Sequence, residues 1–299
     1  MRQEVKRVVL VANPVAGGGR AARLLPLVQQ RLEAKGGRAG HNSCRVGDER
    51  TLARKAARAG VTTIVALGGD GTWSNVARGI LDAGTDTRLA LLAGGTGNDL
   101  ARNVGVPAHD IDATLALAFG DSDRRIDVGY ANDTAFVNSF GVGFDVAVIE
   151  ALARGGGSLG RSAYLSTAAR MLWRYRATVS SFDADSTPRS YLVTVIGNGA
   201  RFGGGMRLAP GATIDDGVLD LVAVRDAAPL RRLLTLLAAA RGKHLGMAGV
   251  EHRTAAAFTL QFETPPRFEV DGELVHSEST TINVRCEKQR LRICARKTH

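Results

Sequence analysis

The chain has 299 residues, 44% of them hydrophobic, and a formal net charge of +10, with 39 Lys and Arg against 29 Asp and Glu. These values are typical of a globular protein of two domains, and they exclude wholesale disorder and a protein with many membrane spans. The basic excess favours anionic partners, namely nucleic acid, a phosphate-bearing ligand or an acidic membrane, although a GC-rich genome also produces such arginine usage.

The N-terminal region predicts a cytoplasmic protein. Its apolar run, Val8–Ala12, is too short for the core of a signal peptide, and we expect it to be a buried strand. The longest apolar stretch, Leu233–Ala240, is well short of the ~18 residues that a spanning helix needs. The three cysteines, Cys44, Cys286 and Cys294, match no metal or disulfide framework and are expected to be reduced.

Residues 1–129 alternate short apolar runs with helical patterns. The runs are Val8–Ala12, Val61–Leu67 and Leu89–Ala93, and helical spacing follows each of them. This alternation predicts βαβ units and a parallel sheet covered by helices on both faces. We therefore expect an open α/β domain at the N-terminus.

Residues 130–286 contain short runs broken by Gly, Asp and Pro, which predict a β-sandwich or barrel. Two helices interrupt them, Arg161–Arg176 and Leu230–Arg241. The expected strands are Ala135–Ser139, Thr178–Phe182, Tyr191–Ile196, Val218–Val224, Phe258–Phe262, Arg267–Val270, Glu273–His276 and Thr280–Val284.

The segment Gly155–Gly160 matches both GxGxxG and GxSxG. It follows a helical run, Val146–Ala153, whereas a dinucleotide fingerprint and a nucleophile elbow both need a strand at that point. We expect a loop with neither function.

Three glycine clusters follow the predicted strands of the α/β domain. They are Asn13–Gly19, Gly68–Thr72 and Gly94–Asp99. The carboxyl ends of parallel strands share one edge of the sheet, and glycine there lets the backbone approach a phosphate at a helix start. A single cluster could be a plain turn with Thr or Asp as a helix cap, but three together predict a phosphate-rich ligand.

Asp70 and Asp99 lie within these clusters and would repel a phosphate unless a cation lay between them. Magnesium binds one or two carboxylates together with phosphate oxygens, which suits these positions. The Walker pattern and the protein-kinase signatures are absent. The sequence therefore predicts a nucleoside triphosphate with Mg²⁺, bound by another kinase architecture.

Together, Gly68–Thr72 and Gly95–Arg102 resemble the diacylglycerol kinase catalytic family, which includes soluble bacterial lipid kinases and sphingosine and ceramide kinases. The resemblance spans about residues 8–275, whereas GGDGT alone is shared with NAD kinases. Further matches, in chain order, are Asn13-Pro14, Asp127–Gly129, Asn138–Asp145, Gly197–Gly199, Phe202–Met206, Ala209-Pro210, Asp215–Gly217 and Asp271–Glu273.

This resemblance implies an ATP-dependent lipid kinase, with diacylglycerol as the favoured acceptor and phosphatidic acid as product. It implies a Rossmann-like ATP-binding domain over residues 1–129, to which 287–299 return, and an antiparallel β-sandwich lipid-substrate domain over 130–286, with catalysis in the cleft between them. Asp70, Asp99 and Asp127 would organise Mg²⁺ and water around the phosphates. By position, ATP would be held by Asn13, Pro14, Gly17, Ser43, Gly69, Asp70, Gly71, Thr72 and Thr96.

Asp271 has two compatible interpretations. From the residues alone, Phe268–Val275 is a hairpin with a type I′ Asp-Gly turn. The resemblance implies that Asp271 is the general base that accepts the proton of the lipid hydroxyl as its oxygen attacks the γ-phosphorus.

A second, structural Mg²⁺ loop is implied at residues 213–218. There Asp216 would supply a carboxylate, while Thr213 and Val218 would offer backbone carbonyls. The alternative is a simple Asp-Gly turn between strands. A departure from the family lies at Asn75, where bacterial members commonly carry glutamate, and it puts a contact at the helix start and the nucleotide preference in doubt.

Two basic segments could contact a membrane surface. In Arg161–Arg176, the side chains of Arg170, Trp173 and Arg174 lie opposite an apolar face, which suits a bilayer surface or, alternatively, a solvated face of a packed helix. The tail from Arg285 to Lys297 could act likewise or contact nucleic acid through phosphates. Because no nucleic-acid-reading motif accompanies it, we expect ATP and lipid as partners, and no nucleic acid.

Two alternatives to a lipid kinase stay open. An NAD kinase would fit GGDGT, but it usually has Asn-Phe-Leu where this chain has Asn98-Asp99-Leu100. A catalytically silent lipid- or nucleotide-binding regulator is favoured only by Asn75. The oligomeric state, including a homodimer, is left open, and we expect a cytoplasmic protein peripheral at the inner face of the membrane.

Overall fold

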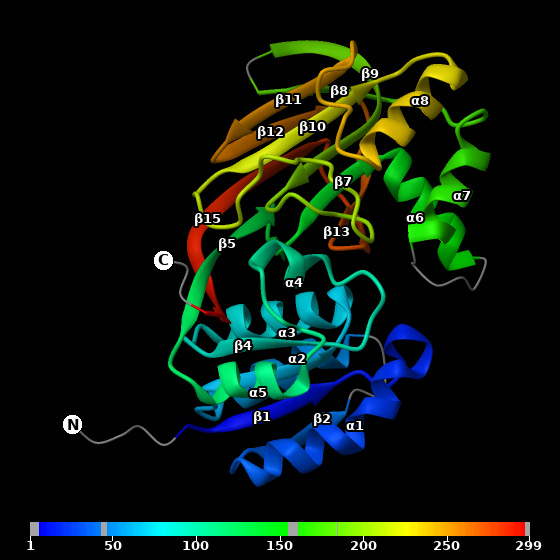
Figure 1. The fold of residues 1–299 in the computed structure, drawn as a ribbon. Coiled ribbons are helices and arrows are strands. Elements are labelled where there is room, and N and C mark those ends of the chain that lie inside the picture. Colours follow the sequence, from blue (N-terminus) through cyan, green and yellow to red (C-terminus); the bar gives the residue numbers. More distant parts are fainter. Residues whose placement is uncertain (1–5, 43–46, 155–160, 184, 297–299) are drawn as a thin grey trace. The chain divides into compact units, whose positions relative to one another are not determined.

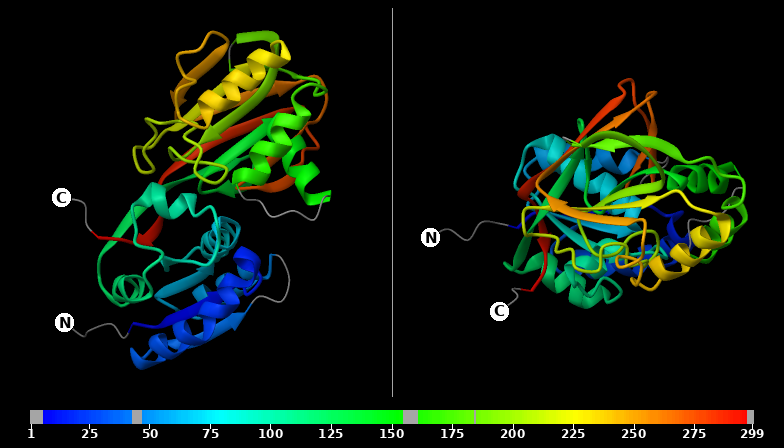
Figure 2. Two further views of the ribbon diagram at one scale, coloured as in Figure 1. Left: turned by 45° about the vertical axis from the view of Figure 1, so that its right-hand side comes forward. Right: turned by 90° about the horizontal axis from the view of Figure 1, so that it is seen from above.

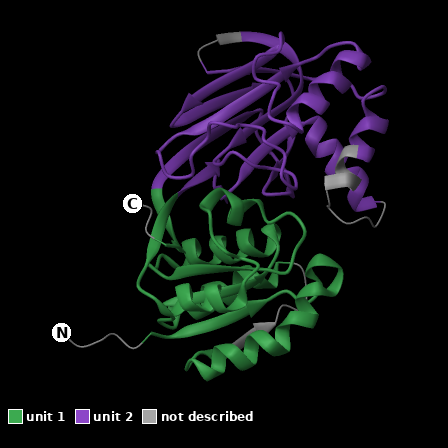
Figure 3. Cartoon of the chain, viewed as in Figure 1, with its two compact units in different colours: residues 1–126, 289–299 green, residues 127–288 purple. Residues whose placement is uncertain are grey.

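In the computed structural model the chain forms two units and passes between them within two strands, β5 (Asp123–Ala131) and β15 (Thr281–Cys294). Unit 1 contains Met1–Ile126 and Gln289–His299, and unit 2 contains Asp127–Lys288 (Figure 3). The structure describes residues 6–42, 47–154, 161–183 and 185–296, with backbone only for 39–42, 161–165 and 185–186. Ser43, Cys44 and the 155–160 segment, named above, lie outside the described residues.

Unit 1 is built on a parallel sheet in the order β2-β1-β3-β4, and the end of β15 adds beside β4 (Figure 1). Every residue of β3 and β4 is buried, as expected for strands covered on both faces. The expected α/β architecture is therefore confirmed. The strands are β1 (Val8–Ala12), β2 (Arg38–Asn42), β3 (Thr63–Gly68) and β4 (Arg88–Ala93).

Helices cover both faces of this sheet. Val28 of α1 and Leu115 of α5 share one core with strand residues such as Leu10, so α1 and α5 lie on the same face. On the other face α2 packs against α3, and the Trp73 indole of α3 donates to the carbonyl of Ala66 at 3.0 Å. The helices are α1 (Ala16–Ala34), α2 (Asp48–Arg58), α3 (Asp70–Ala83), α4 (Asp99–Val104) and α5 (Ile111–Phe119).

Unit 2 is antiparallel, in the order β14-β13-β7-β9-β8-β12-β15, with β11-β10 attached to β9 and β6 paired with β5. Its core gathers aromatic and aliphatic side chains from most of these strands, among them Phe140, Tyr191 and Phe258. The β-sandwich expectation is confirmed. The remaining strands are β6 (Thr134–Phe136), β7 (Ser139–Gly143), β8 (Thr178–Phe182), β9 (Asp185–Gly197), β10 (Leu219–Arg225), β11 (Val250–Ala255), β12 (Ala257–Phe262), β13 (Arg267–Val270) and β14 (Glu273–His276).

Three helices of unit 2 gather at one side of its sheets (Figure 2). They are α6 (Phe144–Arg154), α7 (Arg161–Met171) and α8 (Pro229–Ala239). Phe144, Leu152, Ala168 and Leu172 form a second core with Leu192 of β9. Among the described residues, no helix is both long and apolar enough to cross a membrane.

Two sequence expectations need correction. The run Ala135–Ser139 is not one strand, because β6 ends at Phe136 and β7 begins at Ser139. The backbone amides of Val137 and Asn138, between the two strands, donate to the side chain of Asp271 in the turn between β13 and β14. The helix expected over Arg161–Arg176 ends at Met171.

The basic tail is also not a free surface element, because most of it is the end of β15. Arg285 lies over the Tyr130 ring at 4.5 Å, and Arg292 pairs with Asp86 at 2.7 Å and with Asp123 at 2.8 Å. The bond to Asp123 raises the pKa of the Arg292 guanidinium. These two arginines therefore contact other parts of the chain, whereas Lys288 and Arg290 on the same strand are exposed.

Two of the cysteines behave as reduced packing residues. Cys286 is half-buried, Cys294 is buried, and both are free thiols. Burial raises the pKa of Cys286 to about 12 and that of Cys294 to about 11, so neither is an activated nucleophile.

Candidate active site

The three glycine loops of unit 1 touch one another at the carboxyl edge of the sheet. The amides of Gly94 and Gly95 donate to the carbonyl of Gly68 at 2.7 and 3.0 Å. A Cβ on Gly95 would lie 2.5 Å from the Cα of Gly69, so the backbones approach too closely for any side chain. The loops therefore form one continuous backbone surface at the edge where α/β sheets bind ligands.

The first loop is shaped by glycine and by the Asn13 amide. Gly17 has φ 61°, and a Cβ there would lie 2.1 Å from the carbonyl oxygen of Gly94. The Asn13 side-chain oxygen accepts from the amide of Val15 at 3.2 Å. Asn13, Pro14 and Gly17 thus lie at the loop that contacts Gly94, as a shared nucleotide site requires.

Asp70 is the first residue of α3, and its carboxylate reaches the start of α4. It accepts from the amide of Leu100 at 3.1 Å, and the negative charge of Asp99 acts on it. Burial, followed by the charge of Asp99, raises the pKa of Asp70 to about 6. Asp99 is 4% exposed and takes a 3.3 Å contact from Arg102. Two carboxylates at adjoining helix starts are oxygen donors of the kind that a divalent cation binds.

The other predicted nucleotide residues divide into exposed and buried groups. Gly71 and Thr96 are exposed, and a Cβ on Gly71 would meet nothing within 4 Å. Thr72 is buried, and its side chain packs where a Cβ on Gly68 would lie. Asn75 is also buried, one turn into α3. Thr72 and Asn75 thus pack beneath the loop and do not form its exposed surface.

Asp271 occupies the predicted turn between β13 and β14. Val270 pairs with Glu273, and Asp271 and Gly272 have φ 51° and 85°, the positive values that a two-residue type I′ turn requires. The Asp271 carboxylate accepts three backbone N–H bonds, from Val137 at 2.9 Å, Asn138 at 2.8 Å and Ser139 at 3.0 Å. Its position and its negative charge are therefore fixed by the segment that joins β6 to β7.

A buried carboxyl pair lies directly behind this turn, and the sequence analysis missed it. Glu269 is fully buried and accepts from the amide of Gly272 at 2.6 Å. Burial, followed by the charge of Asp145, raises the pKa of Glu269 well above the usual range. A glutamate between buried Phe268 and Val270 was the available signal.

Asp127 belongs to unit 2, where it holds the predicted metal loop. Its carboxylate is fully buried and accepts from the amide of Gly217 at 2.5 Å, and its amide donates to Ile214. Asp216 is exposed and accepts from the Thr213 hydroxyl at 2.5 Å and the Val218 amide at 3.1 Å. The oxygen donors suit a hard cation by type, but these contacts already close the loop.

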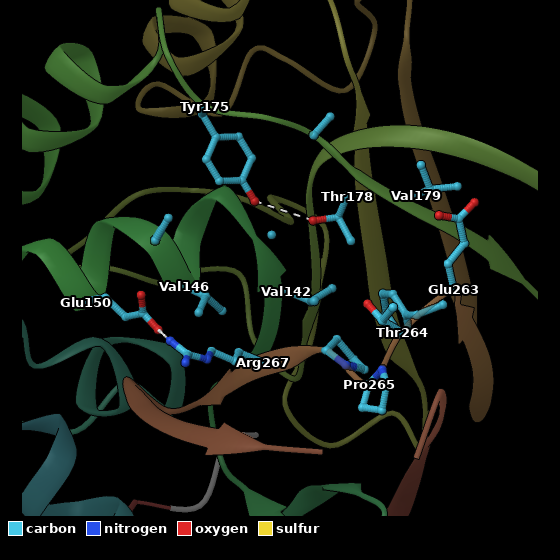
Figure 4. Close-up of a pocket in the computed structure, with 15 residues that line it drawn as sticks. Val142, Val146, Glu150, Tyr175, Thr178, Val179, Glu263, Thr264, Pro265 and Arg267 are labelled. Atoms are coloured by element: carbon cyan, nitrogen blue, oxygen red, sulfur yellow. Dashed lines mark hydrogen bonds and ion pairs between the residues drawn. The ribbon is translucent and has the colours of Figure 1, made fainter. Parts of the chain in front are cut away.

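A cavity of about 440 Å³ opens in unit 2 between α6, the segment after α7 and the β12–β13 connection (Figure 4). Apolar groups such as Val142, Val146 and Pro265 form much of its wall. Polar pairs lie at its edge, with Glu150 to Arg267 at 2.7 Å and the Tyr175 and Thr178 hydroxyls 3.4 Å apart. Its volume lies in the range of small-molecule pockets. The sequence did not predict it, because its wall comes from three separate segments.

Elsewhere the described residues offer no other obvious metal centre. In the described ranges, no group of three or more His, Cys, Asp or Glu side chains could hold an ion. The candidate cation ligands are therefore the carboxylate pair of unit 1 and the loop of unit 2, each of which would need oxygens from backbone, phosphate or water.

Comparison with known proteins covers both units. A family model described as the diacylglycerol kinase catalytic domain matches residues 7–131, and one described as the YegS C-terminal NAD kinase beta sandwich-like domain matches 138–295. A protein of Chromohalobacter salexigens named "Probable lipid kinase YegS-like" is 32% identical over 64% of this chain and 63% of its own length. A "Diacylglycerol kinase" of Bacillus subtilis is 27% identical over 90% of each chain.

A solved structure shares the whole fold. The crystal structure of a diacylglycerol kinase from Bacillus anthracis strain Sterne superposes with a TM-score of 0.73 over 98% of each chain. At 22% identity this likeness concerns the fold alone.

Proposed function

Because the chain belongs to the lipid kinase family in which a diacylglycerol kinase catalytic domain precedes a YegS C-terminal domain, we propose that it transfers the γ-phosphate of ATP to diacylglycerol. The observation that carries this proposal is the Asp70–Asp99 carboxylate pair at the contact of three glycine loops. Such a pair is unfavourable alone and becomes favourable beside a cation and phosphates. Phosphatidic acid would be the product.

The nucleotide is assigned to unit 1. Asn13, Pro14 and Gly17 lie at the first loop, and Gly69, Gly71 and Thr96 lie at the other two, so backbone amides from all three can face the phosphates. Asp70 and Asp99 would hold Mg²⁺, which supplies charge neutralisation on the phosphate oxygens when it is bound.

The proton acceptor is assigned to Asp271 in unit 2. The new bond joins the lipid hydroxyl oxygen to the γ-phosphorus, the bond from that phosphorus to the bridging oxygen breaks, and ADP leaves. The hydroxyl proton goes to the Asp271 carboxylate. Three backbone N–H bonds hold this carboxylate in one place, which suits a reaction that depends chiefly on positioning.

The apolar part of the lipid is assigned to the 440 Å³ cavity of unit 2. Val142, Val146 and Pro265 supply the aliphatic part of its wall, on which a hydrocarbon chain could pack.

An acceptor panel tests the proposed activity. Radiolabelled ATP is supplied with Mg²⁺ and with diacylglycerol, ceramide, sphingosine, phosphatidylglycerol or NAD, the lipids in mixed micelles. We expect labelled phosphatidic acid in the diacylglycerol reaction. Label in NAD alone would make the chain an NAD kinase, and no product in any reaction, together with measured ATP or lipid binding, would make it a regulator.

We also propose that the 213–218 loop binds a structural Mg²⁺ through Asp216 and the carbonyls of Thr213 and Val218, with Asp127 holding the loop in place. Mg²⁺ without nucleotide should then raise the Tm of the wild type and leave that of Asp216→Asn unchanged. An equal response of the two proteins would remove the loop as a metal site.

A further inference from the structure

Helix α8 carries an exposed row of leucines. Leu230, Leu234 and Leu237 are 67%, 52% and 44% exposed, and their spacing of four and three residues places them on one face of the helix. Trp173, just after α7, is 57% exposed. Transfer of such a side chain from water to an apolar medium is favourable by about 1.5–3 kcal/mol. Binding of an apolar partner to this face would therefore lower the free energy.

The inner face of α8 shows that these leucines are not needed to hold the helix. Leu233 and Leu236 pack on the core of α6 and α7. Arg232 is 8% exposed and donates to the carbonyls of Leu172 at 2.6 Å and Tyr175 at 3.1 Å. Buried bonds from Arg232 thus fix which side of α8 faces outward.

The same bonds place Trp173 beside α8, because the two carbonyl acceptors lie on either side of it in the chain. Figure 1 shows α8 on the same side of unit 2 as α6 and α7. The tryptophan and the leucines therefore belong to one side of unit 2, which we call the α7–α8 surface.

Charge on this surface is mainly basic. Residues 151–182 and 227–250 contain nine Arg and Lys and no Asp or Glu, while Asp226, just before α8, pairs with the buried Arg232 at 2.5 Å. Arg170, Arg174, Arg231, Arg241 and Lys243 are exposed. A basic residue near an anionic bilayer contributes about 1 kcal/mol of attraction, and exposed Leu and Trp side chains enter the boundary between headgroups and acyl chains.

We propose that the α7–α8 surface docks on an anionic lipid bilayer, with Leu230, Leu234, Leu237 and Trp173 inserted at the headgroup boundary and the arginines over the phosphates. The charge favours a bilayer over a second copy of this chain, because two such basic surfaces would repel each other. Docking rests on the proposed function in that it explains how the protein reaches a lipid acceptor. Binding to the bilayer itself depends only on the α7–α8 surface.

Vesicle sedimentation tests the docking surface. Wild type is compared with Leu230→Gln/Leu234→Gln/Leu237→Gln, in which glutamine keeps the helix propensity. The matched control is Leu27→Gln/Leu274→Gln, which removes exposed leucines on α1 and β14. On vesicles of phosphatidylcholine with phosphatidylglycerol, we expect the triple variant to bind at least about tenfold more weakly and the control to bind as wild type.

The charge component has its own comparison. Arg231→Glu/Arg241→Glu should lose binding to anionic vesicles and leave the weak binding to pure phosphatidylcholine unchanged. Wild-type binding by the triple variant, or no preference for anionic vesicles, would overturn the proposal. If the wild type is a dimer in the absence of lipid and the triple variant is a monomer, the surface is instead the contact between two copies of the chain.

Phosphorylation of a dispersed short-chain diacylglycerol separates this proposal from the proposed function. We expect the triple variant to keep wild-type turnover on that acceptor and to lose it on vesicles. If the wild type binds vesicles but phosphorylates no lipid, the proposed activity fails and the docking surface stands. If turnover is equal on vesicles for both proteins, docking fails and the activity stands.

Discussion

The two units hold their carboxylates in opposite ways. In unit 1, Asp70 and Asp99 lie close together, and burial and mutual repulsion raise the pKa of Asp70 to about 6. In unit 2, Asp271 is surrounded by three amide donors that satisfy its charge. The carboxylate pair of unit 1 therefore repels itself, whereas the carboxylate of unit 2 accepts hydrogen bonds from three backbone amides.

This contrast agrees with the division of tasks that we propose. A carboxylate pair that is unstable alone binds Mg²⁺ with a gain in free energy, which suits reversible binding of Mg²⁺·ATP. A carboxylate fixed by backbone amides does not move between cycles, which suits a group that must meet one hydroxyl in one orientation. The predictions below test these carboxylates and the loops and side chains that surround them.

The largest effect is expected for Asp271→Asn. The amide keeps the shape, cannot take a proton from the hydroxyl, and turns an N–H group toward one of the three backbone donors. We expect diacylglycerol phosphorylation to fall about 10²–10⁴-fold. Asp133→Asn, at an exposed turn of unit 2, is the control and should keep wild-type turnover; undiminished turnover in Asp271→Asn would remove Asp271 as the base.

The backbone contact between the glycine loops comes next. A Cβ on Gly95 would lie 2.5 Å from Gly69, so Gly95→Ala should lower the free energy of unfolding by about 2–3 kcal/mol in urea titrations. Gly71→Ala meets nothing within 4 Å and should keep its stability while binding ATP more weakly. If both variants unfold alike, the close approach of the loops is not what requires glycine at Gly95.

The buried Glu269 predicts a pH effect on stability. Its pKa is raised in the folded state, so its contribution is fully present below about pH 4.5 and is lost as pH rises, by at most about 1.4 kcal/mol per pH unit. Asp145 and Asp271 are the charged groups that act on it. Glu269→Gln keeps the bond from Gly272, and its stability between pH 5 and 8 should be flatter than that of the wild type. Parallel curves would mean that Glu269 is ionised in the folded protein.

The smallest effect concerns Asp70. Its raised pKa means that stability from this group is greatest below about pH 4 and is lost as pH rises through 6. In EDTA, Asp70→Asn should be more stable than the wild type by about 1–2 kcal/mol at pH 8 and nearly equal to it at pH 4. Urea unfolding at both values checks this, and a variant less stable at pH 8 would contradict the repulsion.

The sequence predicted elements whose signals are local. The apolar run of β1 and the Asp-Gly turn between β13 and β14 were placed with the bounds that the structure has. It missed β2, which has no apolar run, and α2, which is mostly polar. The break between β6 and β7 could not be foreseen, because the amides of Val137 and Asn138 turn toward Asp271, more than 130 residues away.

The candidate site divides in the same way. Motif residues such as Asp70 and Asp99 were found from sequence, and the structure brings them together. The structure adds that Asp127 holds a loop of unit 2, that Glu269 is buried beside Asp145 behind the turn, and that α8 exposes leucines. Each depends on which side chains face each other after folding, which residue spacing along one strand or helix does not specify.

The division of tasks is tested most directly by the Kd of Mg²⁺·ATP for two variants measured side by side. Asp271→Asn should bind Mg²⁺·ATP with the wild-type Kd, whereas Asp99→Asn should bind at least about tenfold more weakly, because it removes half of the carboxylate pair. Loss of ATP binding in Asp271→Asn, or wild-type binding in Asp99→Asn, would contradict the assignment of nucleotide binding to unit 1 and of proton transfer to unit 2.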